Sequence, residues 1–357
     1  MSDRDPGNAY AFKEVREGVY DLDQWNDDYW NRLSFFLEET KKRRIIVQVS
    51  LWDQFDLGNS AHPWFNNVNI PDDLLRNRVD FYNTVETNNL PGLRHQNRFI
   101  DKLLSVSLLY DHVLYNINNE SSEGTIWENY WAQYINRTAE NLGKKVYVTT
   151  MQFDPSASVR HVMTYRDIYS FVEISQNNQD SRGGKGQGHW DNLMNWRQKL
   201  ASFSGGPMPM NNEKVYGAMD GVNYSAGTET EAVNRFWRNI FAGCAASRFH
   251  RPAGTWGSGL NKRVQTNLKA MDMLLEELDI FSCSPHNDLI SHRVTVGSTM
   301  EAYVTANLGK QYAVYFPPGR HTINLDPWVY LDELKIRWLD IDNLTWSEPE
   351  IVKVCLL

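Results

Sequence analysis

Two kinds of segment alternate along most of the chain: amphipathic stretches with apolar residues at helical spacing, and short apolar runs rich in β-branched residues. The run Ile45–Asp53 is of the second kind. It is apolar without strict alternation, which is typical of a buried parallel strand. Asn26 can cap the preceding helix, whose first turn is acidic and whose last turn, Lys41–Arg43, is basic. These charges oppose the helix dipole at both ends and predict where the helix begins and ends.

The same helix–strand unit recurs towards the C-terminus. Further helices are predicted at Asn97–Leu109, Trp127–Leu142, near Tyr165, and at His189–Phe203, Glu229–Gly243 and Asn261–Ile280. Further strands are predicted at His112–Glu120, Lys145–Asp154, Tyr169–Asn178, Lys214–Asp220 and Ala245–His250. This alternation indicates an α/β fold with a parallel sheet covered by helices.

The expected architecture is a TIM-type (β/α)8 barrel that lacks its first strands. A complete barrel needs eight strands. The pattern supplies fewer, and residues 1–25 are too short for the missing strand–helix units. An irregular closure by the N-terminal segment and an open sheet are the alternatives.

The pattern changes after Ser284. Short runs rich in Val, Ile, Tyr and Phe follow, separated by Gly, Pro and Asn, as in MEAYVTANL and QYAVYF. Regularly spaced short strands with turn residues between them predict an antiparallel β-sandwich. We therefore expect a barrel domain over residues 1–284 and a small β-sandwich domain over residues 285–357.

Composition and charge exclude several classes of protein. The 357 residues carry a formal net charge of −8, which argues against nucleic acid as a partner. No apolar run is long enough to predict a membrane span. The three cysteines are scattered, and neither His-x-x-x-His nor Cys-x-x-Cys occurs, so neither metal nor cofactor is predicted. The Gly-x-Ser-x-Gly elbow of serine hydrolases is absent as well. The oligomeric state stays open.

Aromatic residues make up 13% of the chain. They indicate either a core rich in large rings or stacking platforms for flat apolar ligand faces, such as those of sugars.

Polar residues end each predicted strand, where barrel enzymes place their active sites. Two carboxylates that share one cavity suit glycoside hydrolysis, one as the acid and one as the nucleophile or base. Glu120 follows Asn119 at the end of an apolar strand and is the preferred acid/base, with Glu123 as a nearby competitor. Asp220 is the preferred partner. The remaining strand-end and loop residues are predicted to line the sugar subsites: Trp52, Asp53, Trp64, Gln176, Asn177, His189, Trp190, Arg248 and His250.

These segments in this order resemble clan A glycoside hydrolases, specifically the apiosidase-like group with a C-terminal "putative collagen-binding" β-domain. The resemblance rests on YDLDQWNDDYWNRLSFFLEETKKRRIIVQVSLWD, on Asn119-Glu120, on Lys214–Asp220, and on EAYVTANLGKQYAVYFPPGRHTINLD followed by KIRWLDID. It implies an acid/base at Glu120, a nucleophile at Asp220, where the family usually carries Glu, and a sugar-orienting role for Asn119. Residues 1–25 would then be the loop that follows the second barrel strand.

The leading hypothesis is therefore a glycoside hydrolase that cleaves a poly- or oligosaccharide, with retention if the clan geometry holds. The alternative is a carbohydrate-binding protein with a degenerate barrel site and no turnover. A third interpretation is a fragment whose missing strands come from elsewhere. The resemblance implies secretion or a periplasmic location, although the start MSDRDPGNAY has no apolar core typical of a signal peptide.

Overall fold

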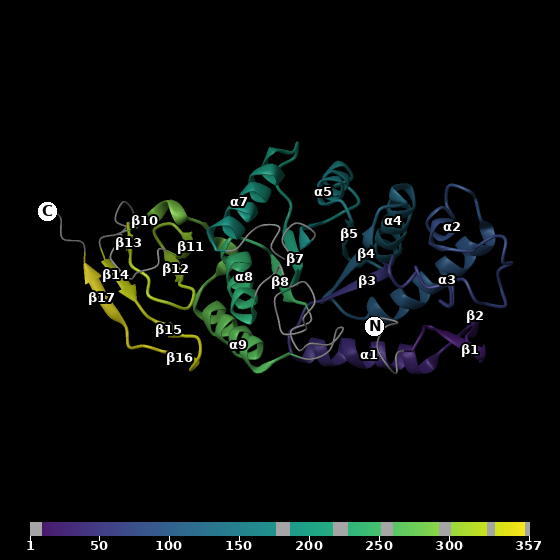
Figure 1. Cartoon of the computed structure of the whole chain (residues 1–357), viewed down its shortest axis with the longest axis horizontal. Coiled ribbons are helices and arrows are strands. Elements are labelled where there is room, and N and C mark those ends of the chain that lie inside the picture. The colour runs from purple at the N-terminus through teal and green to yellow at the C-terminus, as the bar shows by residue number, and fades with distance from the viewer. Residues whose placement is uncertain are drawn as a thin grey trace. The chain divides into compact units, whose positions relative to one another are not determined.

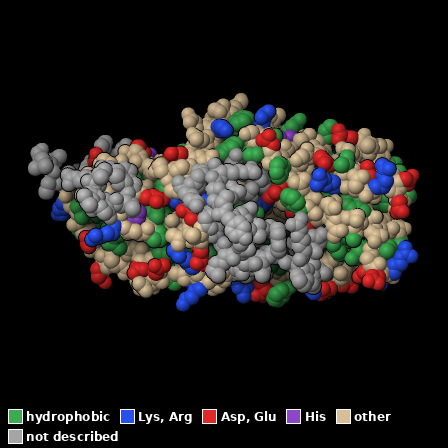
Figure 2. Space-filling view, viewed as in Figure 1, with side chains coloured by type: hydrophobic (Ala, Val, Ile, Leu, Met, Phe, Trp, Pro, Cys, Tyr) green, Lys and Arg blue, Asp and Glu red, His purple; other side chains and the backbone are tan. Residues whose placement is uncertain are grey.

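The computed structural model describes residues 9–175, 186–216, 228–250, 260–292, 301–326 and 333–353. The chain divides into two compact units, Met1–Gln176 (unit 1) and Asn177–Leu357 (unit 2). Figure 1 shows the elements of both. The space-filling view shows acidic and basic side chains interspersed over the face that it presents (Figure 2).

Unit 1 is built around a parallel sheet in the order β3-β4-β5. Its elements are β1 (Phe12–Arg16), β2 (Val19–Trp25), α1 (Asp27–Lys42), β3 (Val47–Asp53), α2 (Arg78–Tyr82), α3 (Leu90–Ser107), β4 (Val113–Ser121), α4 (Thr125–Asn141), β5 (Tyr147–Gln152), α5 (Pro155–Thr164) and β6 (Val172–Glu173). The segment leading into β6 runs beside β5, since the Ser170 N–H donates to the Val148 carbonyl at 2.8 Å. The predicted α/β class with a parallel sheet is thus confirmed.

Helix α1 begins where its cap predicts. The Asn26 side chain accepts a hydrogen bond from the Asp28 N–H, which satisfies one of the first-turn donors that have no partner within the helix. Trp30 and Leu37 of this helix are buried, whereas Phe35 and Phe36 are exposed. Burying a side chain of this size stabilises the fold by about 1.5–3 kcal/mol, which is more than the hydrogen bond of a helix cap contributes.

The N-terminal segment contains a hairpin, and its expected place as the loop after the second barrel strand stays a prediction. Strands β1 and β2 pair antiparallel, with Gly18 in the left-handed region (φ 68°) at the turn between them. The hairpin also holds the long connection after β3, because the Leu22 N–H donates to Asn69 Oδ1 at 2.6 Å and the Tyr20 N–H donates to the Asn66 carbonyl at 3.0 Å. That connection is therefore an ordered segment that contains α2.

Unit 2 contains a parallel pair of strands, helices and several small antiparallel sheets. Its main elements are α7 (Gln187–Ser202), β7 (Met210–Val215), α8 (Glu229–Phe241), β8 (Ala246–Phe249), α9 (Lys262–Glu277), β9 (Ser284–Pro285), β10 (Ile290–His292), β11 (Tyr303–Asn307), β12 (Gln311–Tyr315), β13 (Ile323–Leu325), β14 (Glu333–Ile336), β15 (Leu339–Asp340), β16 (Thr345–Trp346) and β17 (Glu350–Lys353). Strands β7 and β8 pair in parallel, and the later strands pair antiparallel.

Helix α8 packs directly against the later strands. The rings of Trp237 on α8 and Tyr315 on β12 stack at 5.1 Å, and the Tyr315 hydroxyl donates to Asn234 Oδ1 at 2.7 Å. These contacts join segments on either side of the predicted boundary at Ser284 within one compact unit. Among the strands that the structure describes, no sheet closes on itself, so the closed barrel and the β-sandwich stay predictions.

Candidate active site

The carboxyl ends of β3, β4 and β5 bring several of the predicted site residues together. The strand register pairs Asp53 of β3 with Asn119 of β4, and Asn119 in turn with Met151 of β5. The carboxyl ends of parallel strands share one edge of the sheet, so Asp53, Asn119 and Glu120 meet there as expected. We call these three residues the edge cluster.

Glu120 has an unusual backbone conformation within the edge cluster. Its φ of 57° lies in the left-handed region, which few residues other than glycine adopt. The side chain is half-buried, and the Gln54 side chain donates a hydrogen bond to the Glu120 carbonyl. Strain of this kind costs about 1–3 kcal/mol, and strained residues cluster at functional sites.

Asp53 holds the Asn119 amide in place. Asn119 Nδ2 donates to Asp53 Oδ2 at 2.6 Å, and the Phe55 N–H donates to Asp53 Oδ1 at 2.7 Å. The Asp53 carboxylate therefore accepts hydrogen bonds both from the turn after β3 and from the Asn119 side chain. Because a carboxylate can only accept, the amide nitrogen of Asn119 faces Asp53 and its carbonyl oxygen points away.

A buried polar network lies directly behind the edge cluster, and the sequence did not reveal it. Glu128 on α4 is fully buried and accepts from Gln152 Nε2 at 3.0 Å and from Asn118 Nδ2 at 3.4 Å. The Tyr82 hydroxyl donates to Asn118 Oδ1 at 3.0 Å. Burial raises the pKa of Glu128 to about 7, because an apolar surrounding penalises the charged carboxylate.

Two of the three tryptophans predicted to line the sugar subsites lie in the core of unit 1. Trp52 is 4% exposed and Trp64 is 3% exposed. The Trp52 ring packs against that of Trp127 at 4.6 Å, and the Trp64 ring packs against that of Phe81 at 5.1 Å. Their contacts are those of an aromatic core, and their role as sugar ligands stays a prediction.

Two other predicted ligands are buried in unit 2. His189 and Trp190 lie in the first turn of α7 and are 0% and 2% exposed. Arg238 Nε donates to His189 Nδ1 at 3.2 Å, and the Trp190 ring lies 5.0 Å from that of Tyr303. Burial, and then the nearby Arg238 and Arg235, hold the pKa of His189 well below its ordinary value. This imidazole is therefore neutral at physiological pH.

Arg248 and His250 meet at the carboxyl end of β8. An Arg248 guanidinium nitrogen lies 3.1 Å from His250 Nδ1, and Arg248 Nε donates to the Glu213 carbonyl at 3.0 Å. The His250 ring also packs against the Tyr216 ring at 4.7 Å. The remaining predicted site residues, Gln176, Asn177 and Asp220, lie outside the described residues.

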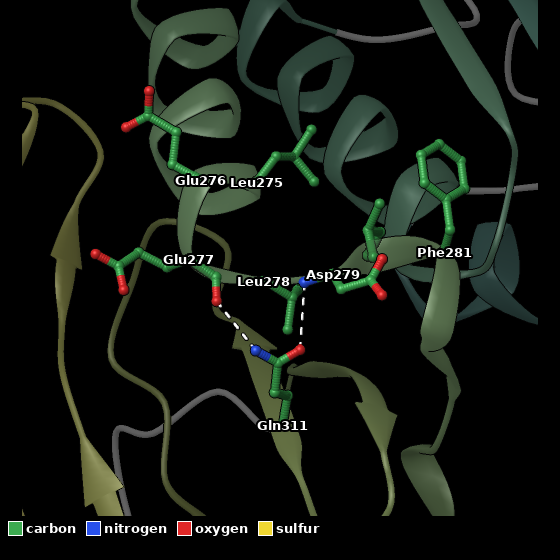
Figure 3. A pocket seen from close by; sticks show the side chains of 8 residues that line it. Leu275, Glu276, Glu277, Leu278, Asp279, Phe281 and Gln311 are labelled. Carbon is green, nitrogen blue, oxygen red and sulfur yellow. Dashed lines mark hydrogen bonds between the residues drawn. The ribbon is translucent and has the colours of Figure 1, made fainter.

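A shallow hollow of about 460 Å³ lies in unit 2 at the end of α9 (Figure 3). Leu275 to Phe281 and Gln311 line it. Figure 3 shows the Gln311 side chain joined to the Glu277 carbonyl and the Asp279 N–H, at 3.1 Å and 3.2 Å. The predicted site residues are absent from this lining.

The described ranges contain no group of three or more His, Cys, Asp or Glu side chains that could hold a metal ion. None of the helices described there is long and apolar enough to cross a membrane.

Comparison with known proteins gives structural neighbours only. No protein-family model matches the sequence, and no curated protein matches it. One similar solved structure is a glycoside hydrolase family 5 protein from Bacteroides vulgatus ATCC 8482, with a TM-score of 0.49 and 12% identity over 78% of this chain. The match spans 59% of that protein's length. A second similar structure is described as a glycoside hydrolase, with a TM-score of 0.46 and 12% identity. The match covers 78% of this chain and 74% of that protein's length.

Proposed function

We propose that the protein is a glycoside hydrolase that cleaves a poly- or oligosaccharide with two carboxylates and no cofactor. Glu120 is the general acid/base, and Asp220 is the nucleophile or second carboxylate. The proposal includes the finer expectations from the sequence: a clan A barrel of the apiosidase-like group with a C-terminal β-sandwich.

The conformation of Glu120 is the observation that carries the proposal. Its left-handed backbone is held from both sides, because the Gln54 side chain donates to the Glu120 carbonyl and the Phe153 N–H donates to the neighbouring Ser121 carbonyl at 2.9 Å. The fold keeps a half-buried acid at the carboxyl edge of a parallel sheet, where α/β enzymes bind their ligands.

The edge cluster suits a sugar substrate chemically. Glu120 would protonate the glycosidic oxygen as the bond to the anomeric carbon breaks, and Asp220 would attack that carbon or activate water. Asn119, oriented by Asp53, would bind a ring hydroxyl next to the reacting carbon. We propose retention of configuration, which requires about 5–5.5 Å between the two carboxyl groups, whereas inversion requires about 6.5–9.5 Å.

The test compares Glu120, at the end of β4, with Glu123 in the segment that follows the strand. Glu120→Gln keeps the size of the side chain and removes the acid, so we expect kcat on polysaccharides to fall by about 10²–10⁴. Glu123→Gln is the matched control, because Glu123 lies three residues further on and is 3.7 Å from Arg78. It should leave kcat within about twofold. Release of reducing ends is measured on β-glucan, xylan, galactomannan and arabinogalactan.

A second substrate identifies the role of Glu120. A dinitrophenyl glycoside has a leaving group that needs no protonation, so Glu120→Gln should lose much less activity in cleaving its aryl bond than on a polysaccharide. The anomer released first, followed by NMR, reports retention or inversion. Unchanged hydrolysis in Glu120→Gln removes the assignment. Glycan binding without any turnover favours the non-catalytic alternative.

A further inference from the structure

Exposed aromatic side chains in unit 1 are few, and two of them stand out by position. Within residues 9–175, the aromatic side chains that are more than a third exposed are Phe35, Phe36, Phe55, Tyr147, Phe153 and Tyr165. Phe55 follows the carboxyl end of β3, and Phe153 follows the carboxyl end of β5. The other four lie on helices, at a helix end or at the amino end of β5.

Backbone hydrogen bonds join Phe55 to the edge cluster and Phe153 to the residue that follows it. The Phe55 N–H donates to Asp53 Oδ1 at 2.7 Å, and the preceding residue, Gln54, donates from its side chain to the Glu120 carbonyl. The Phe153 N–H donates to the carbonyl of Ser121, the residue after Glu120, at 2.9 Å. Phe55 and Phe153 therefore flank Glu120, one from each neighbouring strand.

Phe55 and Phe153 are far more exposed to solvent than the other aromatic rings near these strands. Trp52, Trp64 and Trp127 are at most 4% exposed, whereas Phe55 is 43% exposed and Phe153 is 46% exposed. Leaving a phenyl ring in water forgoes burial energy that these neighbours collect. A ligand with an apolar face recovers that energy when it covers the ring.

We propose that Phe55 and Phe153 are platforms for two sugar rings of one glycan, on opposite sides of the bond that Glu120 protonates. Neighbouring strands lie about 4.8 Å apart, so β3 and β5 are about 10 Å apart across β4. That span is comparable with a disaccharide. The C–H face of a pyranose ring covers each phenyl ring, while Asp53 and Asn119 hold hydroxyls between them. The substrate is then a chain with sugars on both sides of the cleaved bond.

This inference rests on the proposed function for the position of the cleaved bond. Its experiment is therefore done in the Glu120→Gln protein, which binds without cleaving. Native affinity gels containing β-glucan, xylan, galactomannan or arabinogalactan identify a retained polysaccharide, and calorimetric titration gives its affinity. Phe55→Ala and Phe153→Ala should each weaken binding about fivefold or more, and Phe→Trp at either position should restore it.

Tyr147→Ala is the matched control. Tyr147 is 43% exposed, as Phe55 is, and it begins β5, whereas Phe153 follows the opposite end of that strand. This variant should bind within about twofold of the parent. In the active protein, Phe55→Ala and Phe153→Ala should raise KM for a hexasaccharide of the retained glycan more than for an aryl monosaccharide. A structural defect would affect both substrates equally.

The outcomes separate this inference from the proposed function. Unchanged affinity in both alanine variants overturns the inference, even if the wild-type protein hydrolyses glycans. Failure of the Glu120→Gln protein to bind any of the four polysaccharides overturns it as well. Weaker binding in both alanine variants, together with an unchanged Tyr147→Ala, supports it even if the wild-type protein cleaves nothing, in which case the proposed function alone fails.

Discussion

A buried polar network is found in each unit, and the two networks differ in whether their central group is charged. In unit 1, Glu128 accepts hydrogen bonds from the Asn118 and Gln152 amides, with His161 Nε2 3.9 Å from Glu128 Oε2. In unit 2, the fully buried Arg238 donates to Glu231 and, at 3.1 Å, to Glu301. The first network is built from amides around an acid, and the second is built from ions.

The difference follows from what each central group can do when water is removed. Burial raises the pKa of Glu128 to about 7 and lowers the pKa of His161 to about 4, so between these values both groups are neutral and form no ion pair. A guanidinium cannot lose its proton in a protein. Arg238 therefore keeps its charge and needs its carboxylates, and it also lies 5.5 Å from the centre of the Tyr303 ring.

The largest predicted effect on stability comes from removing the buried cation of unit 2, Arg238. Arg238→Met keeps much of the volume but removes the guanidinium that both Glu231 and Glu301 contact. We expect a loss of about 3–5 kcal/mol in the free energy of unfolding, measured from urea denaturation. Arg337→Met is the control, because Arg337 forms a more exposed ion pair with Glu277 at 3.0 Å and should cost about 1 kcal/mol or less.

A second substitution shows whether charge causes the loss. If the uncompensated carboxylates destabilise Arg238→Met, adding Glu231→Gln should recover part of the lost stability. An equally unstable double variant would assign the cost of Arg238→Met to lost packing, and the contrast between the two networks would no longer rest on charge.

The next effect is the pH dependence of the unit 1 network. The pKa of Glu128 is raised in the folded protein from an ordinary value of 4.5 to about 7, so the folded state binds the extra proton. The stability contributed by the neutral acid is fully present below pH 4.5 and is lost as the pH rises towards 7. Glu128→Gln should remove this loss, which amounts to about 3 kcal/mol over that range.

His161 gives the wild-type protein the opposite slope in part of this range. Its folded pKa is lowered from 6.5 to about 4, so its contribution is lost as the pH falls below 6.5. The two slopes nearly cancel between pH 4.5 and 6.5 in the wild type. Glu128→Gln should therefore become more stable as the pH rises through that window, by about 1.4 kcal/mol per pH unit relative to the wild type. Parallel stability–pH curves would contradict a neutral Glu128. Tyr169, whose pKa burial raises, stays neutral throughout.

Local chemistry determined which elements could be predicted. The cap and charges of α1 lie within the helix itself, and its bounds came out within one residue. Helix α3 begins at Leu90, seven residues before the predicted start. The prediction began too late because Pro91 and Gly92 are typical helix breakers in a sequence. Pro is nevertheless tolerated in the first turn, and the Asn89 side chain caps the Gly92 N–H at 3.1 Å.

Some residues of the candidate site could likewise be predicted from the sequence, and others could not. Asp53, Asn119 and Glu120 could be brought together from the sequence because parallel strands end at one edge, and that rule needs no side-chain detail. Glu128 could not be found, since a glutamate in an amphipathic helix is usually solvated and only its tertiary contacts bury it. Likewise the prediction named Trp52 and left Phe55 out, because only packing shows which ring meets solvent.

The smallest predicted effect tests the outer edge of the ionic network. Glu301 Oε1 accepts from Arg238 and, at 2.7 Å, from the Tyr303 hydroxyl, but its side chain is 31% exposed. Water already solvates part of this carboxylate, and Glu231 remains to balance Arg238. Glu301→Gln keeps both acceptor contacts, so we expect a loss of about 1 kcal/mol or less that shrinks in 0.5 M salt, which urea denaturation measures. A loss as large as that of Arg238→Met would mean that Glu301, rather than Glu231, carries the balance of charge.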